Sequence, residues 1–201
     1  MLIIGLTGGI ASGKSTISKL LKRMGAKIID ADIEAKAVTK PNTPAWEELV
    51  KRFGEEILRV DGSIDRRKLG NIVFGDDEKL NTLNNIVHPR AIERIEGKIL
   101  KFKTGNKYKV IVLDAPLLIE TNMVDLVDEV WLVAVDQQTQ INRLMDRDNF
   151  TKEQAKARLQ AQMPLEDKKK VADEIIDNTG SRRQTREQIL SLWQNKVGEL
   201  N

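Results

Sequence analysis

The sequence predicts an α/β fold in which helices cover both faces of a parallel five-stranded sheet. Short runs rich in apolar residues are typical of strands that are buried on both faces. Helical patterns separate these runs, and such alternation favours a three-layer arrangement. The five runs span residues 2–6, 27–30, 110–114, 129–135 and 174–178. A glycine-rich loop follows the first run, and a long helical stretch separates the second run from the third.

The glycine-rich loop fits the pattern G-x-x-x-x-G-K-[ST]. Its glycines allow several backbone N–H groups to turn toward one anion, and Lys14 adds a positive charge at the β- and γ-phosphates. Ser15 offers a hydroxyl to Mg²⁺. An apolar run precedes the loop and helical spacing follows it, which disfavours the alternative of a glycine-rich turn with a surface lysine. The sequence therefore predicts a P-loop that binds a nucleoside triphosphate, with these lining residues: Gly9, Ile10, Ala11, Ser12, Gly13, Lys14, Ser15 and Thr16.

Composition narrows the classes of function. Cysteine is absent, which excludes thiolate metal sites, and the single histidine, His88, excludes a multi-histidine site. Mg²⁺ held by oxygen is the remaining metal. A net charge of +3, from 33 basic and 30 acidic residues, is too slight to predict nucleic-acid binding. The basic run 168–170 lies beside Glu166 and Asp167 and is interpreted as an exposed helix surface. No stretch has the length of a membrane span, so we expect a cytoplasmic protein.

Two acids, Asp30 and Asp32, follow the second predicted strand. The carboxyl edge of an open α/β sheet lines the ligand crevice, so these carboxylates are expected near the P-loop. The alternative for Asp30 is a purely local role as the N-cap of the next helix, predicted over residues 33–39.

Residues 41–106 show successive amphipathic helices without strand alternation. This stretch is far longer than a simple crossover between strands requires, so we expect an inserted subdomain that recognises the second substrate. Pro89 is predicted to begin its last helix with His88 as the cap. Whether His88 and Pro89 cap the helix or contact the substrate is left open.

The third strand ends at Asp114, as in a Walker B element, so Asp114 is a candidate Mg²⁺ ligand, directly or through water. Arg143 and Arg147 are four residues apart on a predicted helix and therefore share a face. The segment that follows the fourth strand and carries these arginines is interpreted as a lid over the phosphates. The alternative is an exposed surface with salt bridges to Asp146 or Glu153.

Two further predictions concern the same region and the tail. Thr151 has the spacing of a capping box, and Pro164 is expected to end the helix that Thr151 begins. The apolar stripe of residues 189–200 predicts a terminal helix that covers the core.

Short motifs along the chain carry a resemblance to a known family. They are Gly5–Ser15, Asp30–Asp32, Asp61–Arg66 with Leu69, Val73 and Phe74, His88–Pro89, Asp114–Glu120, Arg143–Leu144 with Arg147, Ala161–Pro164 and Asp177–Gly180. In this combination the chain resembles the dephospho-coenzyme A kinases over nearly its whole length.

The resemblance implies transfer of the ATP γ-phosphoryl group to the ribose 3′-hydroxyl of dephospho-CoA. It implies Asp32 as general base and Asn178 beside the adenine of ATP. The implied catalytic residues are Asp32, Lys14, Arg143 and Arg147, and the implied acceptor-binding residues are Asp32, His88, Pro89 and Leu117. Mg²⁺ would accompany ATP as co-substrate.

The residue patterns also indicate how the single kinase domain is divided. The core is expected over residues 1–30, 107–138 and 173–201, the acceptor-binding insert over 31–106 and the lid over 139–172. ATP and dephospho-CoA are the expected partners, without nucleic acid or membrane. We expect a monomer, with weak self-association left open.

Other functions remain as alternatives on the same core. A P-loop kinase for another small acceptor, such as a nucleoside, a nucleoside monophosphate or shikimate, has the same loop. A GTP-dependent switch would need Asp-x-x-Gly after the third strand, whereas Ala115–Leu117 follow Asp114. It would also need Asn-Lys-x-Asp, and Asn106–Tyr108 are followed by Lys109. A motor or DNA-linked ATPase would need a basic stripe, which the composition does not indicate.

Overall fold

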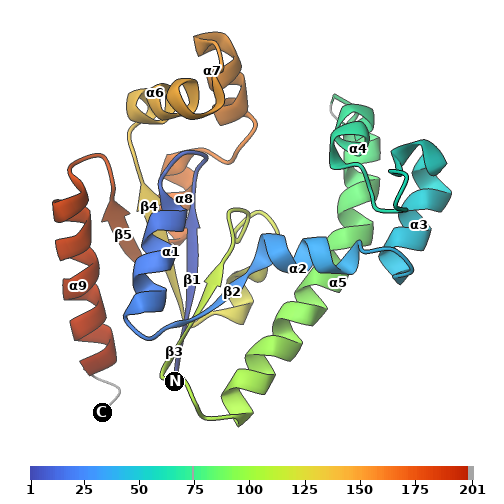
Figure 1. Cartoon of the computed structure of the whole chain (residues 1–201). Helices are drawn as coiled ribbons and strands as arrows, with labels where there is room; N and C mark the ends of the chain where they lie inside the picture. The colour runs from blue at the N-terminus through green and yellow to red at the C-terminus, as the bar shows by residue number, and fades with distance from the viewer. Residues whose placement is uncertain (74, 199–201) are drawn as a thin grey trace. The chain divides into compact units, whose positions relative to one another are not determined.

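The computed structural model describes residues 1–73 and 75–198 (Figure 1). By contacts the chain separates into two compact units. The α/β unit contains residues 1–29 together with 101 onward, and the helical unit contains residues 30–100. Phe74 and Leu200, which the sequence analysis named, lie outside the described residues.

The α/β unit is built on a five-stranded parallel sheet of order β2-β3-β1-β4-β5 (Figure 1). In register, Ile4 of β1 pairs with Val112 of β3 and with Glu129 of β4. The strands are β1 (Leu2–Gly8), β2 (Lys27–Asp30), β3 (Val110–Asp114), β4 (Glu129–Ala134) and β5 (Glu174–Asp177). The predicted fold class is therefore confirmed, and the carboxyl ends of β1 and β3 meet at one edge.

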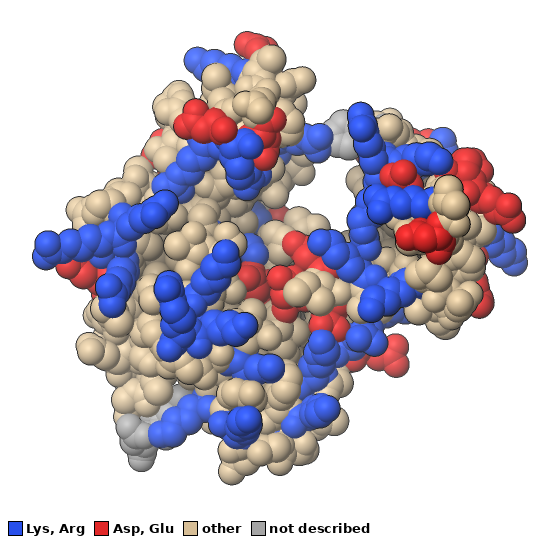
Figure 2. All heavy atoms as spheres, in the orientation of Figure 1, with Lys and Arg blue, Asp and Glu red and all other residues tan. Residues whose placement is uncertain are grey.

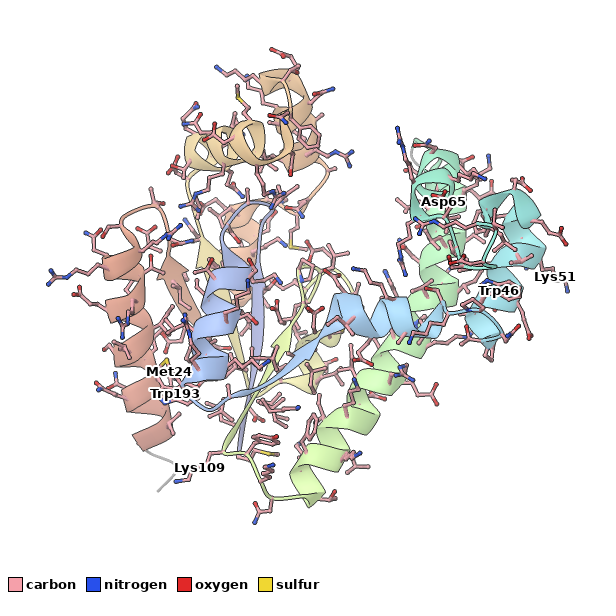
Figure 3. All side chains as sticks on the ribbon, viewed as in Figure 1. Met24, Trp46, Lys51, Asp65, Lys109 and Trp193 are labelled. Carbon is pink, nitrogen blue, oxygen red and sulfur yellow. The ribbon has the colours of Figure 1, made fainter. Side chains whose placement is uncertain are left out.

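Helices α1 (Lys14–Arg23) and α9 (Arg182–Gly198) pack against one face of this sheet. Leu21 of α1 and Ile189 of α9 join the strand residue Trp131 in one buried cluster. Met24 and Trp193, labelled in Figure 3, pack against the same cluster. Lys and Arg side chains gather over α1 in Figure 2, and those in its last turn stabilise the negative end of the helix dipole.

Three helices lie between β4 and β5: α6 (Gln137–Asp148), α7 (Lys152–Gln160) and α8 (Leu165–Val171). Thr151 begins α7 with the predicted capping box. The prediction that Pro164 ends this helix is wrong, because α7 stops at Gln160 and Pro164 is instead the N-cap of α8. The fixed φ of proline suits a helix start, where its missing N–H costs no hydrogen bond.

The helical unit contains α2 (Ala31–Val38), α3 (Pro44–Phe53), η1 (Glu55–Ile57), α4 (Arg66–Val73) and most of α5 (Asp77–Thr104). Its own core is an apolar cluster that includes Leu49, Ile57 and Ile86. Trp46 of α3, labelled in Figure 3, donates its indole N–H to the Gly62 carbonyl at 2.9 Å. This bond ties the loop before α4 to α3.

The prediction that Pro89 begins a helix is wrong. Pro89 lies inside α5, which runs without interruption from Asp77 to Thr104. Proline removes one backbone N–H and so leaves the Asn85 carbonyl without its usual helical donor. At the next residue along the helix, the Arg90 guanidinium donates to the Ile86 carbonyl at 2.7 Å. His88 is therefore a residue within the helix and not its cap.

No helix in residues 1–73 and 75–198 has the length and apolar character needed to cross a membrane.

Candidate active site

The P-loop connects the end of β1 at Gly8 to the start of α1 at Lys14. Gly13 has φ +89°, which a side chain rarely permits, and a Cβ there would collide with the Asn178 amide. At Gly8 a Cβ would come within 2.9 Å of the Val133 carbonyl oxygen. The spacing of glycines in the motif therefore follows from close approaches to other parts of the same unit.

The structure brings the P-loop lysine to the acid that ends β3. Lys14 Nζ donates to Asp114 Oδ1, and both side chains are largely buried. The bond joins the start of α1 to the end of β3, the strand that pairs with β1. It places the predicted phosphate-binding cation beside the predicted Walker B carboxylate.

The chemistry of these donors fits Mg²⁺. The Ser15 hydroxyl and the Asp114 carboxylate are hard oxygen ligands, and Mg²⁺ is usually held by one or two such groups with water and substrate phosphates. Among residues 1–73 and 75–198, no cluster of three or more His, Cys, Asp or Glu residues could hold a metal by itself. A metal that arrives with the nucleotide suits this arrangement.

Arg143 of α6 contacts the P-loop, and its role at the phosphates stays a proposal. Its Nη1 donates to the carbonyl oxygens of Ala11 and Ser12 at 3.3 and 3.4 Å, and its Nη2 donates to the Asn178 carbonyl at 2.8 Å. Asn178 in turn donates Nδ2 to the Ser12 carbonyl at 2.7 Å. Thr185 donates to Asn178 Oδ1 at 2.9 Å and so fixes the orientation of that amide. Arg143 and Asn178 thus hold the backbone of Ala11 and Ser12 together.

Arg147 does not reach the P-loop in this structure. It donates two hydrogen bonds, at 2.9 and 2.7 Å, to the carboxylate of its neighbour Asp148. These bonds raise the pKa of Arg147 and lower that of Asp148. The surface salt bridge that the sequence left open therefore exists, although with Asp148 and not with Asp146 or Glu153. A catalytic role for Arg147 stays a proposal.

Asp30 and Asp32 have different surroundings within the helical unit. Asp30 Oδ1 accepts a hydrogen bond from the Ile33 N–H at 3.0 Å and caps α2, as one interpretation expected. Asp32 is exposed on the first turn of the same helix. Burial lowers the pKa of Arg66, and the negative charge of Asp32 opposes this shift. Asp32 therefore has a cationic neighbour.

The other candidate acceptor residues come from separate segments. His88 and Pro89 lie on α5, where burial lowers the pKa of His88 and favours its neutral form. Leu117, in the α/β unit, is 39% exposed in the segment after β3. Their role in binding the acceptor stays a proposal.

The dephospho-CoA kinase family model matches residues 2–184. The chain belongs to the dephospho-CoA kinase family. This confirms the predicted resemblance, and with it a nucleotide-dependent kinase.

Known members of the family and solved structures resemble the chain over nearly its whole length. A dephospho-CoA kinase from Carboxydothermus hydrogenoformans is 53% identical over 192 residues, which cover 96% of this chain and 93% of that protein. A crystal structure from Thermus thermophilus is 33% identical with a TM-score of 0.82, covering 100% of this chain and 98% of the other. The dephospho-CoA kinase from Campylobacter jejuni is 30% identical with a TM-score of 0.75, covering 99% and 98%.

In this member of the dephospho-CoA kinase family, Lys168 is a buried residue that the sequence analysis misjudged. Its side chain is 1% exposed, and Nζ donates to Glu120 Oε1 at 2.7 Å and to the Pro116 carbonyl at 3.4 Å. Thr7 donates to the same carbonyl at 3.2 Å. An exposed helix surface is therefore the wrong interpretation for Lys168. One signal was present: Lys168 follows Leu165 by three residues, on the half-buried side of α8.

For the two lysines that follow, the interpretation is confirmed. Lys169 pairs with Glu166, and Lys170 pairs with Asp167, both on the outer side of α8.

The sequence analysis also assigned no role to Gln140 and Gln162, which both contact the backbone of Ile10 in the P-loop. A pocket of about 400 Å³ lies beside this contact. Its lining includes Gly9, Gln140, Gln162 and Lys168. Gln162 lies in the family motif Ala161–Pro164, but the sequence could not show its partner, because Ile10 lies more than a hundred residues away in the chain from either glutamine.

Proposed function

We propose that the protein transfers the γ-phosphoryl group of ATP to the ribose 3′-hydroxyl of dephospho-CoA and releases CoA and ADP, the last step of coenzyme A synthesis. The observation that carries this proposal is the pairing of Lys14 with Asp114 at the carboxyl edge of the sheet, in a chain of this family. ATP as the nucleotide is part of the proposal.

The donor half of the site is assigned to the P-loop and the residues around it. Residues 9–16 bind the phosphates through the Lys14 ammonium and through backbone N–H groups of the loop other than that of Ile10, which donates to Gln162. Ser15 and Asp114 would hold Mg²⁺, which supplies charge neutralisation on the triphosphate when it is bound. Asn178 lies on the adenine side. Lys14 exchanges part of its interaction with Asp114 for the phosphate oxygens when ATP binds.

Arg143 and Arg147 add positive charge at the transferred group. Arg143 already contacts the loop, which supports its assignment. Arg147 would have to leave Asp148 first, as residues of a mobile lid can. The lid over residues 139–172 is the element that this part of the proposal requires.

The acceptor half is assigned to residues of the helical insert, about 31–106, together with Leu117. The 3′-oxygen of the acceptor forms a bond to the γ-phosphorus while the bond from that phosphorus to the bridging oxygen breaks. The hydroxyl proton passes to the Asp32 carboxylate, for which the exposure of Asp32 and the role of Asp30 as cap give support. His88, Pro89 and Leu117 are the proposed contacts of the acceptor.

An acceptor panel tests the proposal. Purified protein with ATP and Mg²⁺ is given dephospho-CoA, adenosine, AMP or shikimate, and ADP and the phosphorylated product are measured by mass spectrometry. We expect dephospho-CoA to be preferred and Lys14→Ala to abolish turnover while the fold persists. Preference for AMP or shikimate would establish the alternative kinase, and wild-type turnover by Lys14→Ala would refute the donor site.

We also propose a cytoplasmic monomer that binds neither nucleic acid nor membrane. Light scattering after size-exclusion chromatography tests the monomer, and a mass that rises with protein concentration would show self-association instead.

A further inference from the structure

Ile10 is held at both of its backbone hydrogen-bonding groups by side chains from outside the P-loop. Its N–H donates to Gln162 Oε1 at 2.7 Å. Its carbonyl oxygen accepts from Gln140 Nε2 at 2.8 Å. Gln140 lies on α6, and Gln162 lies between α7 and α8. Two segments of the region after β4 therefore meet at one residue of the phosphate-binding loop.

The polarity of each contact is fixed by chemistry. A backbone N–H can only donate and a carbonyl oxygen can only accept, so Gln162 presents its oxygen and Gln140 its nitrogen. Gly9 makes room for this arrangement: a Cβ there would lie 2.7 Å from Gln140 Nε2 and 3.6 Å from Gln162 Oε1. The glycine and the two amides thus form one closely fitted group.

The loop that these amides hold is conformationally unusual at the next residue. Ala11 has φ +58°, which alanine rarely adopts, and Ser12 N–H closes the turn by donating to the Gly9 carbonyl at 3.1 Å. Such a backbone persists only where its surroundings enforce it. Phosphate-binding N–H groups contribute most when they are oriented before the ligand arrives.

We propose that Gln140 and Gln162 are positioning residues that fix the turn Gly9–Ala11 and thereby orient the P-loop for the triphosphate. This proposal rests on the donor site proposed above. It links the loop to the region 139–172, so the position of that region and the shape of the phosphate site depend on each other.

Exchange of hydrogen-bond polarity at each glutamine tests the proposal. Gln162→Glu keeps an acceptor for the Ile10 N–H, whereas Gln162→Met has the same length but no acceptor. Gln140→Met removes the donor to the Ile10 carbonyl, and Gln140→Glu in addition places a carboxylate against that carbonyl. Gln138→Glu adds the same charge on α6 at an exposed side chain that donates to Asn142 and not to Ile10.

The ranking of Glu and Met variants by kcat/KM for ATP should be opposite at the two positions: Glu better than Met at position 162, and Met better than Glu at position 140. We expect Gln162→Met and Gln140→Met to lose about tenfold, the equivalent of about 1.4 kcal/mol for one lost hydrogen bond. Gln162→Glu should stay within about threefold of wild type, while Gln140→Glu should lose about a hundredfold. The control Gln138→Glu should stay within about twofold of wild type, and KM for dephospho-CoA should not change.

The opposing outcomes are distinct. If Glu is worse than Met at both positions, general repulsion of phosphate explains the losses and the proposal fails. If thermal stability falls while kcat/KM of the folded protein equals wild type in all four variants, the glutamines only support the fold and the proposal also fails. If a Met variant does not fold, the comparison of Gln162→Glu with Gln140→Glu decides alone.

Calorimetric titration with ADP separates this proposal from the proposed function. The same opposite orders are expected in ADP affinity, a measurement that requires no phosphoryl transfer. Should wild type fail to phosphorylate dephospho-CoA, the proposed function fails, and the ADP series still tests the positioning role. Equal ADP affinity in all four variants would contradict it.

Discussion

Asp30 and Asp32 stand two residues apart on the same turn, and their surroundings predict different effects of mutation. Asp32→Asn keeps size and hydrogen bonding but removes the proton acceptor, so kcat should fall by about 10²-fold to 10⁴-fold with ATP binding nearly unchanged. Asp30→Ala removes the cap of α2 and should cost about 1 kcal/mol of stability, whereas Asp30→Asn should retain the cap. We would measure kcat, ATP affinity and thermal midpoint for all three.

The Asp30→Asn variant is the control for loss of a negative charge at this turn. Normal turnover of Asp32→Asn beside an inactive Asp30→Asn would place the base on the other acid. Full activity of both would remove the carboxylates from the mechanism.

Arg143 and Arg147 form a matched pair on α6. Arg143→Ala should lower kcat/KM for ATP, because it removes the contacts with two loop carbonyls and with Asn178. The pair of Arg147 with Asp148 is exposed, and such pairs contribute about 0–1 kcal/mol, so Arg147→Ala should leave the stability nearly unchanged. If Arg147 joins the closed site, its loss lowers kcat more than ATP affinity. Turnover equal to wild type would leave Arg147 as a surface residue.

His88 predicts a pH dependence of stability. Burial places the pKa of His88 in the folded state below its ordinary value of 6.5, so the unfolded chain binds this proton more readily. Well above pH 6.5, His88 is neutral in both states and contributes nothing to the pH dependence of the free energy of unfolding. As the pH falls through 6.5 toward the folded pKa, His88 lowers that free energy, because the unfolded chain takes up the proton first. The free energy of unfolding should therefore fall more steeply on acidification in wild type than in His88→Gln. Urea titrations between about pH 7.5 and about pH 5 measure both slopes, and equal slopes would contradict the prediction.

Among the secondary-structure elements, α8 is held against the rest of its unit by one buried charged side chain, that of Lys168. Lys168→Met should destabilise the protein, because it leaves Glu120 Oε1 without its cation and the Pro116 carbonyl without one donor. Breaking a fully buried pair costs about 3–5 kcal/mol. The Glu120 side chain is 21% exposed, so we expect less, on the order of 2 kcal/mol.

Chemical denaturation of Lys168→Met, Glu120→Gln and the double variant measures this coupling. Lys169→Met, from an exposed pair on the same helix, is the matched control and should change little. Equal stability of Lys168→Met and Lys169→Met would show that the buried pair contributes no more to the free energy of unfolding than the exposed pair.

For the whole molecule, nucleotide and metal should act on stability together. At a free ligand concentration of about 100 times its dissociation constant, binding adds about 2.7 kcal/mol. For a protein of this size that raises the thermal midpoint by roughly 5–10 °C. We expect this shift with ADP and Mg²⁺, a smaller one with ADP and EDTA, and none with Lys14→Ala. Activity should disappear with EDTA and return with Mg²⁺, and full activity in EDTA would refute the metal proposal.

The sequence alone determined the architecture and the donor loop of this protein. The P-loop pattern, the apolar strands and the capping box at Thr151 are set by residues that are neighbours in the chain, so their spacing is sufficient to predict them. The place of Asp114 at the carboxyl edge of the sheet could be predicted for a related reason. Asp114 ends an apolar strand, and all strands of a parallel sheet have their carboxyl ends at the same edge.

Only the tertiary structure decided which side chains meet. Gln162 contacts Ile10 across 152 residues, and Arg143 contacts Ala11 across 132. The choice of Glu120 as the partner of Lys168 and the unbroken path of α5 through Pro89 likewise could not be predicted from local spacing. Propensity and periodicity describe one segment at a time, whereas these features depend on which segments pack together, and packing overrides local preference.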